Sequence, residues 1–266
     1  MAFLRREIAR VEGRGSAEPP APVRRFSASG QRATLDALLS PARLAGNLHE
    51  IMSASPPDMF SALGFALRLA AVFAHERGRT GMALVIEDFL VRETGAPYGP
   101  GLLEAGVDPA RLLIVRTQGP RETLRAMEDA LRCKGVGAVV AESAIDARLY
   151  SLDVSRRLTL AARAGGGAGF LAPVALAGAG ARLSSTAETR VEIARRSSAS
   201  IPVGGAHLGL PGAPGVRLRI LKARGMSGLD SERVHEVAYD AFSLGLSPLS
   251  VDRPDQTVGG RAALSA

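Results

Sequence analysis

Three carboxylates follow directly after apolar segments of the chain. Glu87 and Asp88 come after Gly81–Ile86, and Glu142 comes after Val136–Ala141. Short, continuous apolar runs predict buried strands of a parallel sheet, and the carboxyl ends of such strands lie along one edge. Carboxylates gathered at that edge can bind a cation, or they can cap helices and pair with arginines. We expect the second role, so the sequence predicts no metal site and no catalytic residue.

Other residue types that often carry chemistry are few. The four histidines, His49, His75, His207 and His235, do not form the His-Glu-x-x-His pattern of a zinc helix. The single cysteine, Cys133, excludes a disulfide within the chain, and we expect it to be a small buried residue. The glycine-rich run 165–169 follows a predicted helix and precedes a predicted strand, the reverse of a dinucleotide site, so it predicts a turn.

Arginine is the most promising functional residue type. The chain carries 33 basic and 26 acidic residues, for a net charge of +7. Between Arg182 and Arg224 there are eight basic and two acidic residues, a net of +6. Such a segment can bind nucleic acid, bind an acidic protein, or remain a solvated face with no partner. The candidate residues for nucleic-acid or partner binding are Arg148, Arg156, Arg157, Arg190, Arg195, Arg196, Arg217 and Arg219.

Alternating strand and helix patterns organise the first two thirds of the chain. Predicted strands are 49–52, 81–86, 112–115, 136–141 and 169–174, and predicted helices are 59–75, 99–105, 121–133 and 155–164. Beyond Ala181 the pattern changes to half-exposed strands at 189–196, 216–223 and 236–242, with a mobile loop expected at Ile201–Gly215. The predicted fold class is α/β: a mostly parallel central sheet flanked by helices, with antiparallel strands at the C-terminal edge.

Composition predicts a globular protein with a large core. The chain has 266 residues, of which 46% are hydrophobic and 22% charged. No stretch approaches 18 uninterrupted apolar residues and the N-terminus has no signal-peptide pattern, so a cytoplasmic location is expected. We predict an N-terminal helix and flexible linker over residues 1–30, a core domain over 31–251 and a disordered tail over 252–266.

The order of these segments resembles the core of RecA-type recombinases. The unit Leu48–Phe73 has the position of the Walker A motif, Gly81–Asp88 that of the strand with the catalytic glutamate, and Val136–Ser143 that of the Walker B strand. The narrower resemblance is to the ImuA family, RecA-like accessory factors of bacterial translesion synthesis. It rests on segments 98–102, 108–113, 126–133, 155–162 and 216–225 and extends over about 41–242.

The loop that corresponds to the phosphate-binding loop lacks the residues which that chemistry needs. A phosphate-binding loop uses glycine amides, a lysine and a Ser/Thr that holds Mg²⁺. Here the segment Met52–Ser61 contains neither Lys nor Gly. Two prolines remove amide donors and an aspartate would repel a nucleotide, so the sequence predicts no nucleotide cofactor and no ATP hydrolysis. The residues of this degenerate loop are Ser53, Ser55, Pro56, Pro57 and Asp58.

The ImuA resemblance implies a non-catalytic role in damage-induced (SOS), error-prone DNA synthesis. The partners that it implies are an ImuB-like relative of Y-family polymerases, a DnaE2-like error-prone polymerase, RecA and DNA, with no membrane partner and association with the nucleoid on recruitment. Two alternatives remain at this point. One is a weak ATPase that uses a nucleotide as a switch, and the other is a SulA-like inhibitor of cell division that binds FtsZ.

Overall fold

The computed structural model describes residues 30–145, 148–174, 184–198, 200–203, 206–211, 214–227, 231–239 and 246–248. The predicted N-terminal helix and linker up to residue 29, and the predicted tail 252–266, lie outside the described residues.

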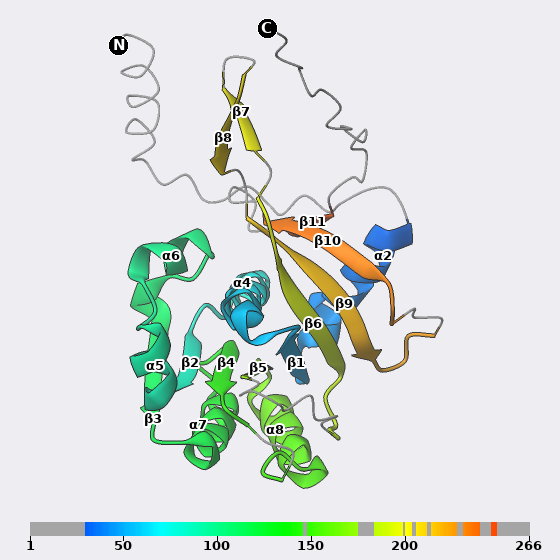
Figure 1. Ribbon diagram of the computed structural model, residues 1–266. Helices are drawn as coiled ribbons and strands as arrows, with labels where there is room; N and C mark the ends of the chain where they lie inside the picture. The colour runs from blue at the N-terminus through cyan, green and yellow to red at the C-terminus, as the bar shows by residue number, and fades with distance from the viewer. Residues whose placement is uncertain are drawn as a thin grey trace, which may run out of the picture.

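A nine-stranded sheet forms the centre of the protein (Figure 1). Its strand order is β11-β10-β9-β6-β1-β5-β4-β2-β3. From β3 to β6 all neighbouring strands are parallel, and from β6 to β11 they are antiparallel. The strands are β1 (Leu48–Ser53), β2 (Met82–Glu87), β3 (Leu112–Thr117), β4 (Ala138–Ser143), β5 (Ala168–Pro173), β6 (Thr189–Arg196), β9 (Gly215–Ala223), β10 (Val234–Tyr239) and β11 (Leu246–Pro248). The predicted fold class is confirmed.

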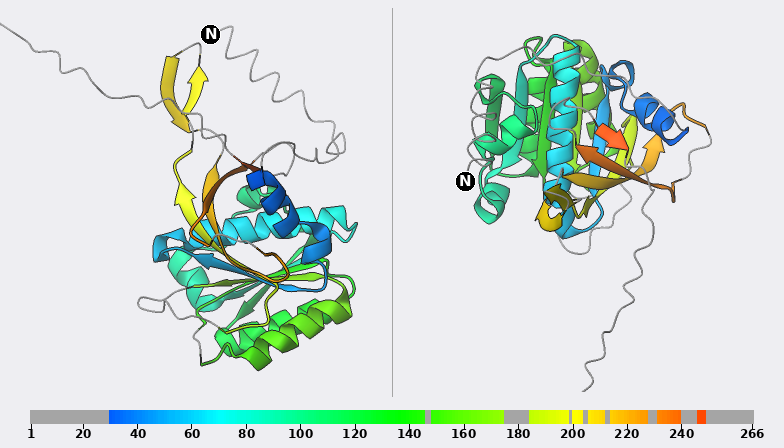
Figure 2. Two further views of the ribbon diagram at one scale, coloured as in Figure 1. Left: turned by 90° about the vertical axis from the view of Figure 1, so that its right-hand side faces the viewer. Right: turned by 90° about the horizontal axis from the view of Figure 1, so that it is seen from above.

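Helices cover the two faces of this sheet unequally. The described helices are α2 (Gly30–Leu38), α3 (Pro41–Leu44), α4 (Met59–Glu76), α5 (Asp88–Thr94), α6 (Gly99–Glu104), α7 (Pro120–Arg132) and α8 (Leu152–Gly165), with short 3-10 turns η1 (Pro56–Asp58) and η2 (Pro109–Arg111). Figure 2 shows α4 on one face and α7 with α8 on the other. Each face therefore has its own apolar core, one around α4 and one beneath α7 and α8.

The α4 core is built from a helix that is apolar on nearly every side. Pro56–Glu76 is long and apolar enough to span a membrane, but 61% of its most apolar window is buried inside the protein. Phe65 and Phe73 of α4 are fully buried against the sheet. A helix that is hydrophobic all round is the normal centre of a large core.

Helix α8 has well-defined ends. The Ser151 side chain accepts a hydrogen bond from the backbone N–H of Val154, an N-cap. At the other end Gly166 adopts the left-handed conformation at φ 72°, which glycine adopts without strain. The predicted turn in the glycine run is thus confirmed, and the run serves to end α8 before β5 begins.

Helices α7 and α8 pack closely because a glycine lies at their contact. A Cβ built on Gly165 would lie 1.9 Å from the carbonyl oxygen of Leu131. Arg79 ties the same end of the molecule together, since its guanidinium donates to the carbonyls of Gly165 and Val136, each at 2.9 Å, and to that of Lys134. The end of the sheet at which the parallel strands begin is therefore held together by the packing of α7 on α8 and by the hydrogen bonds from Arg79 to backbone carbonyls.

The structure differs from three sequence predictions. The first strand of the later group, β6, is parallel to β1 and joins the two parts of the sheet. The expected mobile loop contains an antiparallel hairpin of β7 (Ser200–Val203) and β8 (Ala206–Pro211), since both segments have the alternating pattern of strands. Cys133 is exposed rather than buried, because it lies just beyond the end of α7.

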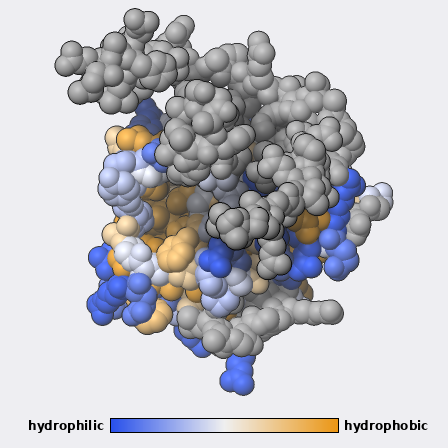
Figure 3. All heavy atoms as spheres, turned by 45° about the horizontal axis from the view of Figure 1, so that its top comes forward, coloured by the Kyte–Doolittle hydropathy of each residue, from blue (hydrophilic) through white to orange (hydrophobic). Residues whose placement is uncertain are grey.

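Apolar side chains also reach the surface on the α4 side. Phe60 of α4, Tyr98 at the start of α6 and Leu103 of α6 are all exposed. Figure 3 shows apolar residues gathered on this face of the molecule, bordered by hydrophilic ones.

Candidate functional site

The loop between β1 and α4 holds a carboxylate where α4 begins. The Asp58 side chain is buried, and its Oδ1 accepts the backbone N–H of Arg195 on β6 at 2.8 Å. Its Oδ2 accepts a hydrogen bond from the Ser55 hydroxyl. The Arg195 guanidinium approaches Oδ1 at 3.8 Å. The start of a helix favours negative charge, and here the charge comes from the protein itself.

These contacts keep Asp58 ionised. Burial of the carboxyl favours its protonated form, but the hydrogen bonds from Ser55 and from the Arg195 backbone outweigh that effect and lower the Asp58 pKa. The positive charges of Arg195 and Arg217 act in the same direction. The carboxylate is therefore negative at neutral pH.

The amides of this loop are bonded within the protein. The N–H of Asp58 donates to the Ser55 carbonyl at 2.9 Å, and the N–H of Met59 donates to the Pro56 carbonyl. The N–H of Ala54 donates to Ile193 of β6 at 2.9 Å. A loop that cradles phosphate presents its amides to the ligand. These three amides are turned to protein acceptors instead.

The three carboxylates at the strand ends have different surroundings. Glu87 is buried and accepts hydrogen bonds from the Ser143 hydroxyl and from the backbone N–H of Ala144 at 2.9 Å. Asp88 accepts the Arg116 guanidinium at 2.5 Å and the Gln118 amide at 3.0 Å. Asp88 therefore pairs with an arginine as expected, whereas Glu87 makes no cap on α5 and instead binds groups that follow β4.

Glu142 is the exception among the three. It is 3% exposed, and its strand β4 pairs with β2, which ends in Glu87. Burial, together with the neighbouring negative charge of Glu87, raises the Glu142 pKa to about 7. Close to neutral pH this carboxyl is therefore partly protonated.

A buried polar network joins β1, β6 and the start of α8. Glu50 of β1 is fully buried and accepts hydrogen bonds from the Tyr150 hydroxyl at 2.7 Å and from the Arg190 guanidinium. Arg190 also donates to the Ser185 hydroxyl at 3.2 Å. Burial and the Glu50 charge raise the Tyr150 pKa, so the phenol stays a hydrogen-bond donor. The sequence analysis did not identify Glu50 or Tyr150, although a glutamate inside an apolar strand is itself a sign of a buried partner.

Several of the predicted arginines bind carboxylates of the same chain. Arg190 forms an ion pair with Glu50, and Arg157 forms one with Glu128 of α7. On the strands, Arg196 lies 3.0 Å from Glu236 and Arg219 lies 2.7 Å from Glu192. With Arg195 near Asp58, ion pairs to carboxylates in the described part of the chain are formed by Arg157, Arg190, Arg195, Arg196 and Arg219. Their charge is partly offset within the fold.

The other three predicted arginines lie on two parts of the surface. Arg148 and Arg156 are exposed at and just before α8, and Arg217 is exposed on β9. Tyr150, just before α8, packs in the core on the face opposite α4. Val216 and Leu218 of β9 pack in the core around α4, so by alternation Arg217 also points to the face opposite α4. The predicted contact of all eight arginines with nucleic acid or a partner stays a prediction.

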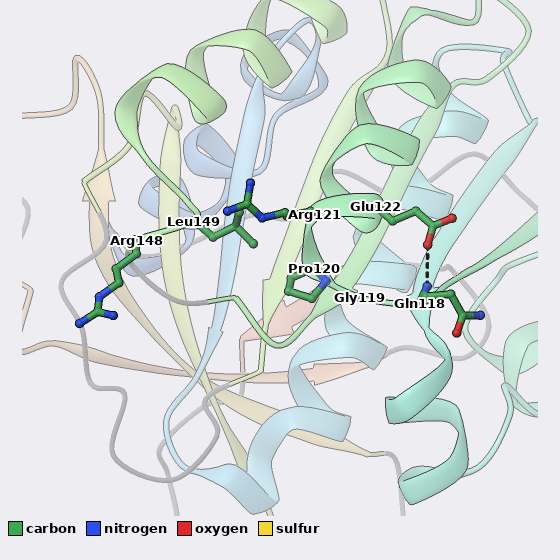
Figure 4. A pocket seen from close by; sticks show the side chains of 7 residues that line it. All are labelled: Gln118, Gly119, Pro120, Arg121, Glu122, Arg148 and Leu149. Atoms are coloured by element: carbon green, nitrogen blue, oxygen red, sulfur yellow. Dashed lines mark hydrogen bonds between the residues drawn. The ribbon is translucent and has the colours of Figure 1, made fainter.

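A surface cavity of about 550 Å³ lies at the start of α7 and is lined by Gln118, Gly119, Pro120, Arg121, Glu122, Arg148 and Leu149. In Figure 4 the Glu122 carboxylate turns back to the Gln118 backbone N–H, at 2.7 Å. Arg121 lies beside Leu149, whereas Arg148 points away from the other lining residues. The charged groups of this cavity do not converge on one point.

Comparison with known proteins identifies a relationship for part of the chain. No protein-family model matches it. A stretch of 74 residues is 45% identical to ImuA of Caulobacter vibrioides, in each of two strains. Part of this chain is homologous to ImuA. The matched stretch covers 28% of this chain and 29% of ImuA, so most of the length of ImuA is unmatched.

The solved structures include a crystal structure of SulA from Pseudomonas aeruginosa that aligns with 48% of this chain and 98% of SulA. The TM-score is 0.36 and the sequence identity 18%. At these values the likeness adds nothing to the ImuA homology.

Proposed function

We propose that this protein is a non-catalytic, RecA-like accessory factor in damage-induced (SOS), error-prone translesion DNA synthesis. Two findings support the proposal: the homology of one segment to ImuA, and the carboxylate of Asp58 at the start of α4. The second is the observation that carries the non-catalytic part. A nucleotide phosphate placed there would face a negative group and amides that are already bonded.

The experiment for the biological role is deletion of the gene in the bacterium that encodes it. We expect the frequency of mutations induced by ultraviolet light to fall, and the wild-type gene to restore it. Deletion of a SulA-like inhibitor would instead abolish filament formation after damage and leave mutation frequency unchanged, and that result would contradict the proposal. Binding to FtsZ in place of an ImuB-like protein would contradict it as well.

The proposed partners are an ImuB-like relative of Y-family polymerases, a DnaE2-like error-prone polymerase and RecA. Co-purification of each with this chain, with and without residues 1–30, tests these contacts and the role of the N-terminal segment. We also propose the division into residues 1–30, a core of 31–251 and a tail of 252–266. A cytoplasmic location, with recruitment to the nucleoid after damage, is tested by imaging a fluorescent fusion.

Direct contact with DNA is proposed through the exposed arginines. Arg156 and Arg217 carry this prediction best, because both are exposed. Their replacement by Ala should weaken binding to single-stranded DNA to a similar degree for all sequences, and should reduce the dependence on salt. A fluorescence anisotropy titration at two salt concentrations measures both effects. Equal binding by the Arg156→Ala/Arg217→Ala double variant and the wild type would contradict DNA contact at these residues.

A nucleotide switch is the second candidate function, favoured by the two adjacent buried carboxylates Glu87 and Glu142. We expect ATP with Mg²⁺ to leave the thermal unfolding midpoint unchanged. A rise in that midpoint that disappears in Glu142→Gln would favour the switch over the non-catalytic role.

A further inference from the structure

The strand at one edge of the sheet presents apolar side chains to solvent. Among the described residues β3 pairs only with β2, so no strand of the described part of the chain pairs with its other side. Leu113 is 60% exposed and Ile114 is 42% exposed, although both belong to a strand. Native proteins usually protect such an edge with charges, proline or a covering element, because it is a template for another strand.

The two exposed side chains point to opposite faces of the sheet. Val115 packs with the core beneath α7 and α8, whereas Leu112 packs with the core around α4. Because side chains alternate along a strand, Leu113 lies on the α7 face and Ile114 on the α4 face. A partner that covers both must therefore add to the edge itself, and a helix on one face would cover only one of them.

We propose that β3 pairs antiparallel with β3 of a second copy of this chain, forming a two-fold symmetric dimer with a continuous sheet. This proposal does not depend on the role in translesion synthesis. A two-fold dimer is isologous, so the same strand must complement itself. The pattern Leu-Leu-Ile-Val-Arg-Thr of β3 does so in one register.

In that register Ile114 lies opposite Ile114 of the partner subunit. Leu113 then lies opposite Val115, and Leu112 opposite Arg116, with five strand residues of each copy in the ladder. A shift by one residue would place opposite residues on different faces. In a register with Leu113 opposite Leu113 of the partner subunit, only three strand residues of each copy would pair. The remaining strand residues would lie opposite the η2 turn.

Charge also allows this pairing. Arg116 would lie opposite a leucine rather than an arginine, and it already pairs with Asp88 at 2.5 Å. Like charges directly opposite each other destabilise a sheet, and this register places none there. A register centred on Val115 would place Arg116 opposite Ile114 and Thr117 opposite Leu113. Fewer apolar residues would then lie opposite each other.

Cysteine cross-linking tests the register. Directly opposite residues of antiparallel strands have Cα atoms about 4.5–5.5 Å apart, within the range that a disulfide bridges. In a Cys133→Ser background, Ile114→Cys should form a covalent dimer on mild oxidation, detected on a non-reducing gel. Leu113→Cys, and Leu103→Cys on α6, should cross-link much less in the same background. Equal cross-linking at all three positions, or cross-linking at residue 113 in place of residue 114, would overturn the proposed pairing.

Sedimentation of the full chain tests the dimer without oxidation. The wild type should sediment as a dimer, and Ile114→Lys should sediment as a monomer because two ammonium groups would meet at the axis. The matched control is Leu160→Lys on α8, where the native leucine is 51% exposed. It should remain dimeric. Thermal unfolding of each variant verifies folding, and Leu113→Lys replaces Ile114→Lys if the latter does not fold. A monomeric wild type, or a dimer that survives the lysine on β3, would overturn the proposal.

Discussion

The carboxyl group of Glu142 makes the stability of this protein fall as pH rises towards 7. Its pKa is raised from 4.5 to about 7 by burial and by Glu87. Below pH 4.5 the Glu142 carboxyl is protonated in both the folded and the unfolded state, so it does not lower the free energy of unfolding. As pH rises to 7 only the unfolded state loses the proton, so the free energy of unfolding falls, by about 3 kcal/mol in total.

Glu142→Gln should remove this penalty. We predict that the variant is more stable than the wild type by about 3 kcal/mol at pH 8 and nearly equal to it at pH 4, measured by urea unfolding. The comparison variant is Glu87→Gln, whose Oε1 can still accept from Ser143 and Ala144 but which removes the charge beside Glu142, so it should relieve part of the same penalty at pH 8. An equal difference between Glu142→Gln and wild type at both pH values would show that the Glu142 pKa is not raised.

At the scale of elements, the contact between α7 and α8 depends on a residue without a side chain. Gly165→Ala would place a methyl group 1.9 Å from the Leu131 carbonyl oxygen, so the two helices would have to move apart. We predict a loss of about 1–3 kcal/mol in the free energy of unfolding, the usual cost of overpacking.

The matched control for Gly165→Ala is Gly64→Ala in α4. A Cβ at Gly64 meets nothing within 4 Å, and the residue lies inside a helix. Alanine there should raise stability by about 0.5–1 kcal/mol, because glycine is a weaker helix former. Chemical denaturation of both variants measures the contrast, and a similar effect at the two positions would refute the packing argument.

At the scale of the whole molecule, the Glu50–Arg190–Tyr150 network connects the parallel and antiparallel parts of the sheet. Arg190→Ala would leave the Glu50 carboxylate buried without its cation. We predict a loss of about 3–5 kcal/mol, the cost of breaking a buried ion pair on one side. Arg156→Ala, on the exposed face of α8, should change stability by less than about 0.5 kcal/mol.

This contrast separates two roles that arginine plays in the molecule. If Arg190→Ala is as stable as Arg156→Ala in thermal unfolding, the network does not stabilise the fold. Arg190 is then again a candidate for binding nucleic acid or a partner. If Arg190→Ala is destabilised as expected, a reduced binding affinity of this variant reflects the loss of folded protein and not the loss of a contact with the ligand. Exposed arginines such as Arg156 and Arg217 are then the informative positions.

Local patterns along the chain were sufficient for the main elements. The apolar segment Met59–His75 predicts α4, and the continuous apolar runs before Glu87 and Glu142 predict β2 and β4 within two residues of their ends. The helix α5 at Asp88–Thr94 was not predicted, because it is short and amphipathic only in part. The loop residues 53–58 and their lack of Lys and Gly are likewise visible in the sequence.

By itself, then, the sequence determined the fold class and the alternation of strands and helices, and it contains no Lys or Gly in the loop after β1. Periodicity and residue type are local properties, so a single chain displays them. Only the tertiary structure decided which charges meet: Glu50 with Arg190, 140 residues apart, and Asp58 with Arg195, 137 residues apart. It also decided that β3 lies at an edge, because strand order follows from how the whole sheet assembles and no local pattern encodes it.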